Sequence, residues 1–159
     1  MTSALTYVLG APGSGKTTVA PLLRHELPHH IVIDWDAFMD QASDLYGADV
    51  RRSPVAWRPY RDLVHRVVAE IAPRSVVVLG PCTPEELPQW SIGQWLLLDC
   101  DDHERARRLG ADMPPAAIAD ALRDAATYRS LGMAQVNSTG VSAEETAKRL
   151  VSAIEDCPS

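Results

Sequence analysis

The stretch Gly10-Ala11-Pro12-Gly13-Ser14-Gly15-Lys16-Thr17 decides the fold of this 159-residue chain. It fits the pattern Gly-x-x-x-x-Gly-Lys-Ser/Thr of a phosphate-binding loop, or P-loop. Its glycines permit a tight backbone path whose N–H groups surround a phosphate. Lys16 brings a positive charge to the transferred phosphate, and the Thr17 hydroxyl is a ligand for Mg²⁺. Ordinary residue frequencies give this pattern in under about 1% of chains of this length, so we predict a nucleoside triphosphate site.

The residues on either side of the loop have the local structure that a P-loop requires. Residues 5–9 form a short apolar run that is typical of a strand, and residues 15–27 have helical spacing. The predicted helix directs its positive N-terminal end toward the bound anion. Pro21 lies inside this helix and is expected to bend it.

Strands and helices alternate along the rest of the chain. We expect further strands at residues 31–33, 75–79, 94–98 and 133–136, and helices at residues 36–45, 57–71, 102–109, 115–131 and 143–154. Residues 46–56 and 81–93 are expected to be loops. This alternation predicts an α/β fold with a parallel, five-stranded sheet between two layers of helices. The length predicts a single domain over residues 1–159.

The composition limits the classes of partner. The net charge of −6 at pH 7 disfavours a protein that coats nucleic acid. No apolar run approaches the ~18 residues needed to cross a bilayer, and residues 1–5 contain no basic targeting region. We therefore expect a cytoplasmic protein that does not bind membranes.

Two acids follow the second predicted strand, in Ile33-Asp34-Trp35-Asp36. In a parallel sheet they lie at the carboxyl end of the strand, near the P-loop. Acids at that position hold Mg²⁺ and its waters, or orient and deprotonate an acceptor hydroxyl. The alternative is that one of them caps the following helix. We favour a functional role for Asp36, which lies beyond the end of the strand.

Two later segments place polar residues after predicted strands: Asp99-Cys100-Asp101-Asp102-His103-Glu104-Arg105-Ala106-Arg107-Arg108-Leu109 and Asn137-Ser138-Thr139-Gly140. With the P-loop and the acid pair, they resemble the small P-loop kinases. This family includes shikimate and gluconate kinases, nucleoside and nucleotide kinases, and the chloramphenicol phosphotransferase and zeta-toxin relatives. The resemblance spans nearly the whole chain, and the P-loop is its most specific part. It implies a three-layer P-loop fold with a short lid around residues 101–130, and a kinase that uses ATP and Mg²⁺.

The resemblance also implies a role for individual residues. Asp36 binds the acceptor hydroxyl, and Arg105 and Arg108 belong to a lid helix whose arginines stabilise the migrating phosphoryl group. Asp34 and Thr17 hold Mg²⁺. The nucleotide-binding residues are Gly10, Ala11, Pro12, Gly13, Ser14, Gly15, Lys16, Thr17, Thr18, Asn137, Thr139 and Gly140. The chain departs from the family in lacking a second lid arginine near Asp112, and in having Gly80-Pro81 where a metal-binding acid follows the third strand.

The mixed charges around the two lid arginines leave a second interpretation open, a solvated helix face with salt bridges. The acceptor is less defined. Arg58 and Arg61 are three residues apart on a predicted helix and can share a face, which suits an anionic acceptor. Alternatively they pair with surface acids, and a neutral acceptor stacks on Trp35 or Trp57.

The leading hypothesis is an enzyme that transfers the γ-phosphoryl group of ATP to a hydroxyl or phosphate of a small metabolite, nucleoside or nucleotide. A second hypothesis is a nucleotide-binding regulatory or slow ATPase module without a small-molecule acceptor. The absence of an Asn-Lys-x-Asp motif counts against a GTPase switch. A third is a polynucleotide-end kinase, which the acidic charge disfavours.

Overall fold

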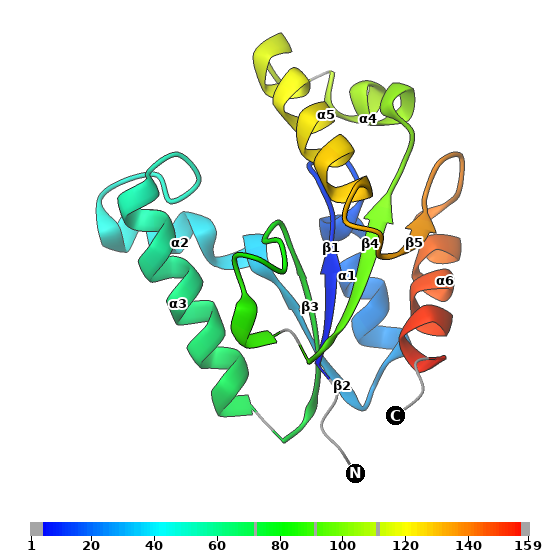
Figure 1. The fold of residues 1–159 in the computed structure, drawn as a ribbon, viewed down its shortest axis with the longest axis horizontal. Helices are drawn as coiled ribbons and strands as arrows, with labels where there is room; N and C mark the ends of the chain where they lie inside the picture. Colours follow the sequence, from blue (N-terminus) through cyan, green and yellow to red (C-terminus); the bar gives the residue numbers. More distant parts are fainter. Residues whose placement is uncertain (1–4, 72, 91, 111, 157–159) are drawn as a thin grey trace.

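The structure is a computed structural model that describes residues 5–71, 73–90, 92–110 and 112–156. Five parallel strands form one sheet in the order β2-β3-β1-β4-β5 (Figure 1). The predicted five-stranded parallel sheet is therefore confirmed. The strands are β1 (Leu5–Leu9), β2 (His30–Asp34), β3 (Ser75–Gly80), β4 (Gln94–Asp99) and β5 (Ala134–Asn137).

Helices cover both faces of the sheet. They are α1 (Lys16–Glu26), α2 (Met39–Tyr46), α3 (Pro54–Ile71), α4 (Asp102–Leu109), α5 (Pro115–Arg129) and α6 (Ala143–Glu155), with short 3-10 helices η1 (Trp35–Phe38) and η2 (Pro88–Trp90). The side chains of β1 alternate between two cores. Tyr7 and Leu9 pack with residues of α3 and α5, whereas Val8 packs with α1 and α6. The structure is thus three-layered.

The sheet order places the P-loop at the centre of the molecule. Strand β1 lies between β3 and β4, so the loop that follows Leu9 emerges at the middle of the carboxyl edge of the sheet. Strand β2 is one strand further out, beyond β3, and carries its acids to the same edge. Ligands bind at this edge in open α/β sheets.

Helix α3 begins at Pro54, three residues earlier than predicted, so the expected loop at 46–56 is shorter. Ser53 is the reason, because its hydroxyl accepts a hydrogen bond from Ala56 N at 3.2 Å. A serine cap followed by proline at the first helical position is a common helix start. The expected helix at 36–45 is divided into η1 and α2, and α2 ends at Gly47, whose φ of 75° suits glycine.

The last helix begins as predicted. The Ser142 hydroxyl accepts a hydrogen bond from Glu145 N at 3.2 Å, which caps α6. Within the described ranges, no helix combines the length and the apolar character needed to cross a membrane.

Candidate active site

The P-loop joins β1 to α1, with its backbone folded as the motif requires. Gly13 and Gly15 have φ values of 80° and 104°, which a side chain would strain. A Cβ on Gly13 would also lie 3.1 Å from side-chain atoms of Arg105 and Leu109. Helix α4 therefore packs directly against the outside of the loop.

Lys16 is the buried cation of the loop, with 7% of its surface exposed. Its Nζ donates hydrogen bonds to the carbonyl oxygens of Gly10 and, at 3.3 Å, Ala11. Burial lowers the pKa of Lys16 to about 8, while the nearby carboxylates of Asp36 and Asp34 oppose that shift. The ammonium and both acids are thus brought together, as the sequence predicted.

The two acids have different surroundings. Asp34 ends β2 and is buried, and its Oδ1 accepts a hydrogen bond from Asp36 N at 3.1 Å, so Asp34 caps η1. Asp36 is partly exposed. Burial raises the pKa of Asp36, and the charges of Lys16 and Arg51 oppose that rise. A carboxylate with a raised pKa next to a phosphate-binding lysine is suited to accept a proton.

Oxygen atoms are the available metal ligands at this site. The Thr17 hydroxyl is at the exposed start of α1, and the Asp34 carboxylate is near Lys16. The described residues contain no group of three His, Cys, Asp or Glu side chains that could enclose an ion. Mg²⁺ is commonly held by few protein ligands together with water and substrate phosphates, so these residues fit that ion.

The last position of β3, Gly80, cannot hold a metal-binding acid, which explains one departure from the kinase pattern. A Cβ on Gly80 would collide with the Tyr7 hydroxyl and lie 3.0 Å from the Cβ of Trp35. The same hydroxyl accepts a hydrogen bond from Cys82 N at 2.9 Å. The packing of this aromatic residue thus requires glycine at position 80.

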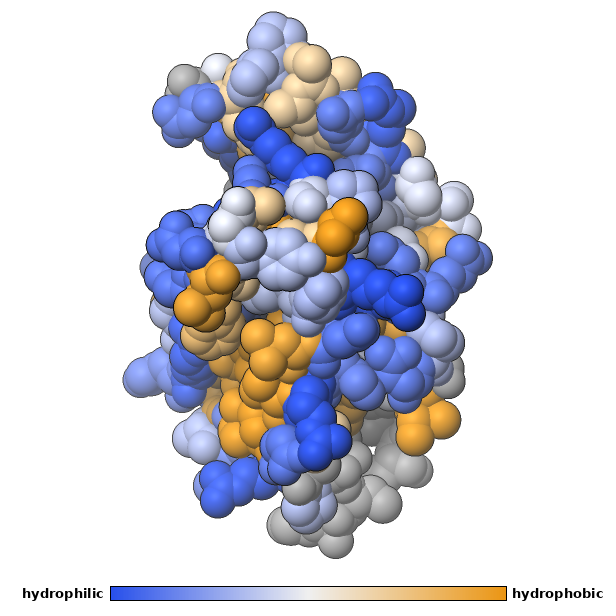
Figure 2. Space-filling model, turned by 90° about the vertical axis from the view of Figure 1, so that its left-hand side faces the viewer, coloured by the Kyte–Doolittle hydropathy of each residue, from blue (hydrophilic) through white to orange (hydrophobic). Residues whose placement is uncertain are grey.

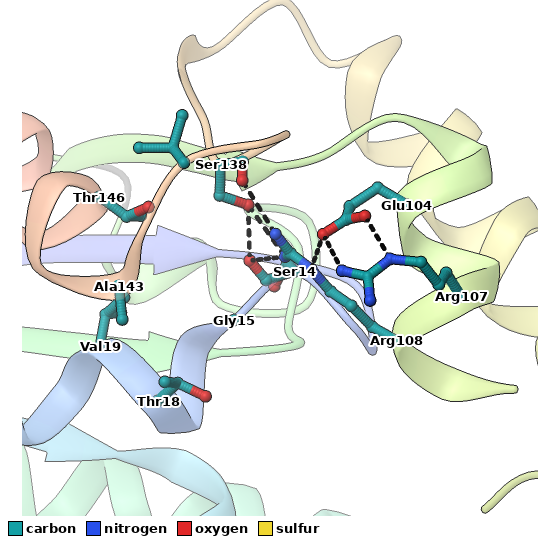
Figure 3. Close-up of a pocket in the computed structure, with 11 residues that line it drawn as sticks. Ser14, Gly15, Thr18, Val19, Glu104, Arg107, Arg108, Ser138, Ala143 and Thr146 are labelled. Atoms are coloured by element: carbon teal, nitrogen blue, oxygen red, sulfur yellow. Dashed lines mark hydrogen bonds and ion pairs between the residues drawn. The ribbon is translucent and has the colours of Figure 1, made fainter. Parts of the chain in front are cut away.

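A pocket of about 350 Å³ opens beside the P-loop (Figure 3). The P-loop and α1, the helix α4, and the segment from β5 into α6 all contribute to it. Its lining residues are Ser14, Gly15, Thr18, Val19, Glu104, Arg107, Arg108, Ser138, Val141, Ala143 and Thr146. The pocket has the position and the mixed polar and apolar lining of a nucleotide-binding site.

Arg108 crosses this pocket from α4. Its guanidinium donates hydrogen bonds to the carbonyl oxygens of Gly13, Ser14 and Ser138, at 3.1, 3.3 and 2.9 Å, and to the Ser138 hydroxyl at 3.1 Å. Its Nε pairs with Glu104 at 2.9 Å. Figure 3 shows the contacts of Arg108 with Ser14, Ser138 and Glu104 converging on its guanidinium. Arg108 is partly exposed, so it is accessible to a bound nucleotide.

Arg105 has a different environment on the same helix. It is fully buried, and its guanidinium pairs with the buried carboxylate of Asp99 and donates to the carbonyl oxygens of Pro12 (2.6 Å) and Ala11 (3.3 Å). Asp99 also accepts hydrogen bonds from Arg129 and Gln135. The predicted direct contact between Arg105 and a phosphoryl group does not fit this geometry, because the guanidinium is enclosed behind the P-loop.

The loop after β5 is organised by its own side chains. Asn137 Oδ1 accepts a hydrogen bond from Thr139 N at 2.8 Å, and Thr139 Oγ1 accepts one from Asp101 N at 2.8 Å. Gly140 has a φ of 64°. These three predicted nucleotide-binding residues do not line the pocket, although neighbouring Ser138 and Val141 do.

The residues predicted to bind the acceptor differ in how far their side chains are buried. Trp35 is fully buried among Tyr7, Trp57, Tyr60 and Trp90, so the prediction that it stacks on an acceptor does not fit this conformation. Trp57 is partly exposed.

The two arginines of α3 also differ. Arg58 is exposed. Arg61 is partly buried, with 25% of its side chain exposed, and lies 3.6 Å from Asp62. Its Nε is buried and has no hydrogen-bond partner in the described structure. Burial raises the pKa of the Cys82 thiol, while Arg61 lowers it and Asp36 raises it. Arg61 and Asp36 therefore both lie near Cys82.

A central parallel strand, the P-loop that follows it and the nucleotide-sized pocket beside it define a P-loop nucleotide-binding protein. The family model described as "AAA domain" matches residues 7–129, so the chain belongs to that family.

Several similar proteins are kinases. Shikimate kinase 2 of Photorhabdus laumondii is 24% identical over 152 residues, which cover 96% of this chain and 79% of that protein. The structure of shikimate kinase from Acinetobacter baumannii in complex with shikimate has a TM-score of 0.70 at 19% identity, over 97% of this chain and 94% of the other. A gluconokinase structure from Sinorhizobium meliloti 1021 has a TM-score of 0.68 at 16% identity, over 97% and 94%. The fold agrees with the prediction from the sequence, and so does the class, an ATP-dependent small-molecule kinase.

Several pocket residues were not identified from the sequence. Ser138 joins Arg108 to the P-loop, since its hydroxyl also donates to Ser14 O at 3.1 Å. Glu104 holds Arg107 and Arg108. A serine in a loop and a glutamate on a charged helix are common, so neither gave a distinct signal. The i,i+4 spacing of Glu104 and Arg108 was the available clue.

Proposed function

We propose that the protein transfers the γ-phosphoryl group of ATP to a hydroxyl of a small anionic acceptor bound between Asp36 and Arg61. The observation that carries this proposal is the position of Asp36. Its carboxylate lies near Lys16, and Asp36 and Arg61 both lie near Cys82. A hydroxyl bound to Asp36 would therefore meet a phosphate bound to Lys16.

The chemistry needs little from the protein beyond positioning and charge. Asp36 orients the acceptor hydroxyl and accepts its proton as the oxygen attacks the γ-phosphorus. The bond from that phosphorus to the β–γ bridging oxygen breaks, and ADP leaves. Lys16, moving from the loop carbonyls to the phosphates, stabilises the charge on the transferred group. Mg²⁺, held by Thr17 and Asp34, supplies neutralisation of the phosphate charge when bound.

The two lid arginines receive separate roles in this proposal. Arg108 contacts the nucleotide, because it is accessible in the pocket beside the P-loop. Arg105 is a positioning residue that holds the carbonyl oxygens of Ala11 and Pro12 away from the phosphate. The Pro12 carbonyl shares its peptide group with the Gly13 N–H, so this contact leaves the Gly13 donor free to point inward.

The anionic character of the acceptor is inferred from Arg61. The buried Nε of Arg61 has no hydrogen-bond partner in the described residues, and a buried donor in that state is costly unless something binds it. Carboxylate or phosphate matches the fork of arginine in two places. Arg58 is three residues away, but it is exposed, and serves as the matched control.

A screen for ADP release tests the proposal. The panel includes shikimate, gluconate, nucleoside monophosphates, neutral nucleosides and hydroxylated antibiotics. We expect turnover with an anionic hydroxylated acceptor. Arg61→Ala should raise the Michaelis constant for that acceptor at least tenfold and leave that for ATP unchanged, while Arg58→Ala changes neither. ATP hydrolysis that no acceptor stimulates would instead support the slow ATPase module, and good turnover of neutral acceptors would exclude the role of Arg61.

A further inference from the structure

Figure 2 shows a side of the molecule on which exposed apolar side chains gather. Six of the nine large apolar residues that are exposed in the described chain come from η1, α2, α3 and the residues beside them. They are Phe38, Leu45, Tyr46, Val55, Leu63 and Val67. We call this surface the α2–α3 face. Contiguous apolar surface of this kind is uncommon on monomeric soluble proteins and usually marks a binding site.

The α2–α3 face is also hollowed. Two adjoining depressions, of about 320 and 190 Å³, share Ala42, Leu45, Tyr60 and Leu63. None of their lining residues lines the nucleotide pocket. The face therefore does not overlap the nucleotide pocket, and the inference drawn from it does not rest on the proposed function.

Charged residues on α3 lie beside the apolar ones, and their charges alternate in sign along the helix. Arg58, Asp62, Arg66 and Glu70 are four residues apart and all exposed. The apolar residues Val55, Leu63 and Val67 lie at neighbouring positions on the same side of the helix. Among these four described residues, an ion pair forms only between Arg66 and Glu70, at 2.6 Å. Exposed pairs of this kind add little stability to the helix.

This alternation is self-complementary. When a second α3 is laid antiparallel across the first, with a two-fold axis near Val64, Arg58 faces Glu70 and Asp62 faces Arg66. Every charge then meets its opposite, twice, as a two-fold interface requires. The chain carries a net charge of −6, so two copies repel at long range, and the balanced charges of α3 provide a surface where they can approach.

The length of α3 suits a dimer interface. Helix α3 has 18 residues and is therefore about 27 Å long. A standard interface buries about 800 Å² on each partner, and a patch of that area is about as wide as this helix is long. An apolar centre bordered by charged residues is the usual anatomy of such a surface.

We propose that the α2–α3 face binds a second copy of this chain in a two-fold symmetric dimer, with the two α3 helices antiparallel. Arg58–Glu70 and Asp62–Arg66 pairs between the copies set the register, and Leu63 lies near the centre.

Measurement of the molar mass of the full chain tests the assembly. The 17.3 kDa chain should have twice that mass by light scattering after size exclusion at roughly 10 μM. Leu63→Glu should give a folded monomer. Ile92→Glu, at a position that is 99% exposed away from this face, should leave the dimer intact. A monomeric parent protein at roughly 100 μM would overturn the proposal and leave the face to a different partner.

Charge reversal tests the antiparallel arrangement. Arg58→Glu and Glu70→Arg, each alone, place like charges opposite one another and should weaken the dimer at least tenfold in sedimentation equilibrium. The double variant carrying both changes restores opposite charges and should recover most of the affinity. Additive weakening in the double variant would show that these two positions do not face each other, and the register would be wrong.

Discussion

Replacing Arg105 by methionine tests whether this arginine supports the P-loop from behind. The variant removes the guanidinium that pairs with Asp99 and binds the carbonyl oxygens of Ala11 and Pro12. Methionine keeps much of the apolar volume that packs against Gly13. The loss is therefore mainly one of charge and hydrogen bonds.

The expected loss of stability depends on the partners that Asp99 keeps in the variant. Breaking a buried ion pair typically costs about 3–5 kcal/mol, because the other charge is left buried. Asp99 keeps Arg129 at 2.6 Å and Gln135 at 3.0 Å, so we expect the lower end, about 3 kcal/mol. For a chain of this length, that lowers the melting temperature by roughly 6–12 °C.

Urea unfolding measures the free energy of unfolding of the variant, and titration with ATP measures its nucleotide affinity. We expect ATP affinity to fall about tenfold, since the loop loses its outer contacts. Arg105→Lys keeps the charge but not the fork and should be intermediate. Arg149→Met removes an exposed arginine of α6 and should cost less than about 0.5 kcal/mol. If Arg105→Met lowers the free energy of unfolding by less than about 1 kcal/mol and binds ATP normally, Arg105 does not support the P-loop.

Four further predictions concern the phosphate and acceptor residues. Lys16→Ala should abolish phosphoryl transfer and weaken ATP binding while the protein stays folded; full activity would exclude the P-loop function. Asp36→Asn should lower turnover about 10²-fold or more with little change in ATP affinity, and a larger loss in Asp34→Asn would reverse the assigned roles. Arg108→Ala should lower turnover more than ATP affinity if closure completes the site, whereas unchanged kinetics would favour a purely structural salt bridge with Glu104. Because burial lowers the pKa of Lys16 to about 8, the ammonium is charged at pH 7 and mostly neutral at pH 9. ATP affinity measured by calorimetry should therefore fall about tenfold between these values, and a flat profile would contradict a desolvated lysine.

The sheet and the P-loop were predictable because their signals are local. Residues 10–17 encode their own backbone path, and the apolar strands are separated by helices of regular period. The start of α3 was missed because Ser53-Pro54 reads equally well as a loop or a helix start. The difference depends on whether the serine hydroxyl caps Ala56, as it does here.

The roles of Arg105 and Arg108 could not be separated from the sequence. Both lie on one highly charged helix, where a solvated face is the common outcome. Arg105 turns inward because Asp99 is buried at the end of β4 and needs a counter-charge. In the sequence, however, Asp99 stands beside Asp101 and Asp102 and looks like part of an exposed acidic turn. Only the register of β4 in the sheet distinguishes them.

The contacts of the Asp99 carboxylate limit how the lid, residues 101–130, can move. This carboxylate connects the start of α4 through Arg105, the end of α5 through Arg129 and strand β5 through Gln135, while the Tyr128 hydroxyl fixes the end of α5 to Pro81 O at 2.7 Å. A rigid swing of residues 101–130 would break the bonds of Arg105 and Arg129 to Asp99 and the bond of Tyr128 to Pro81. Motion that keeps these bonds would be confined to the first turns of α5. An enzyme built in this way would admit and release its nucleotide through a small local opening, so its turnover would be insensitive to solvent viscosity compared with kinases whose whole lid must travel.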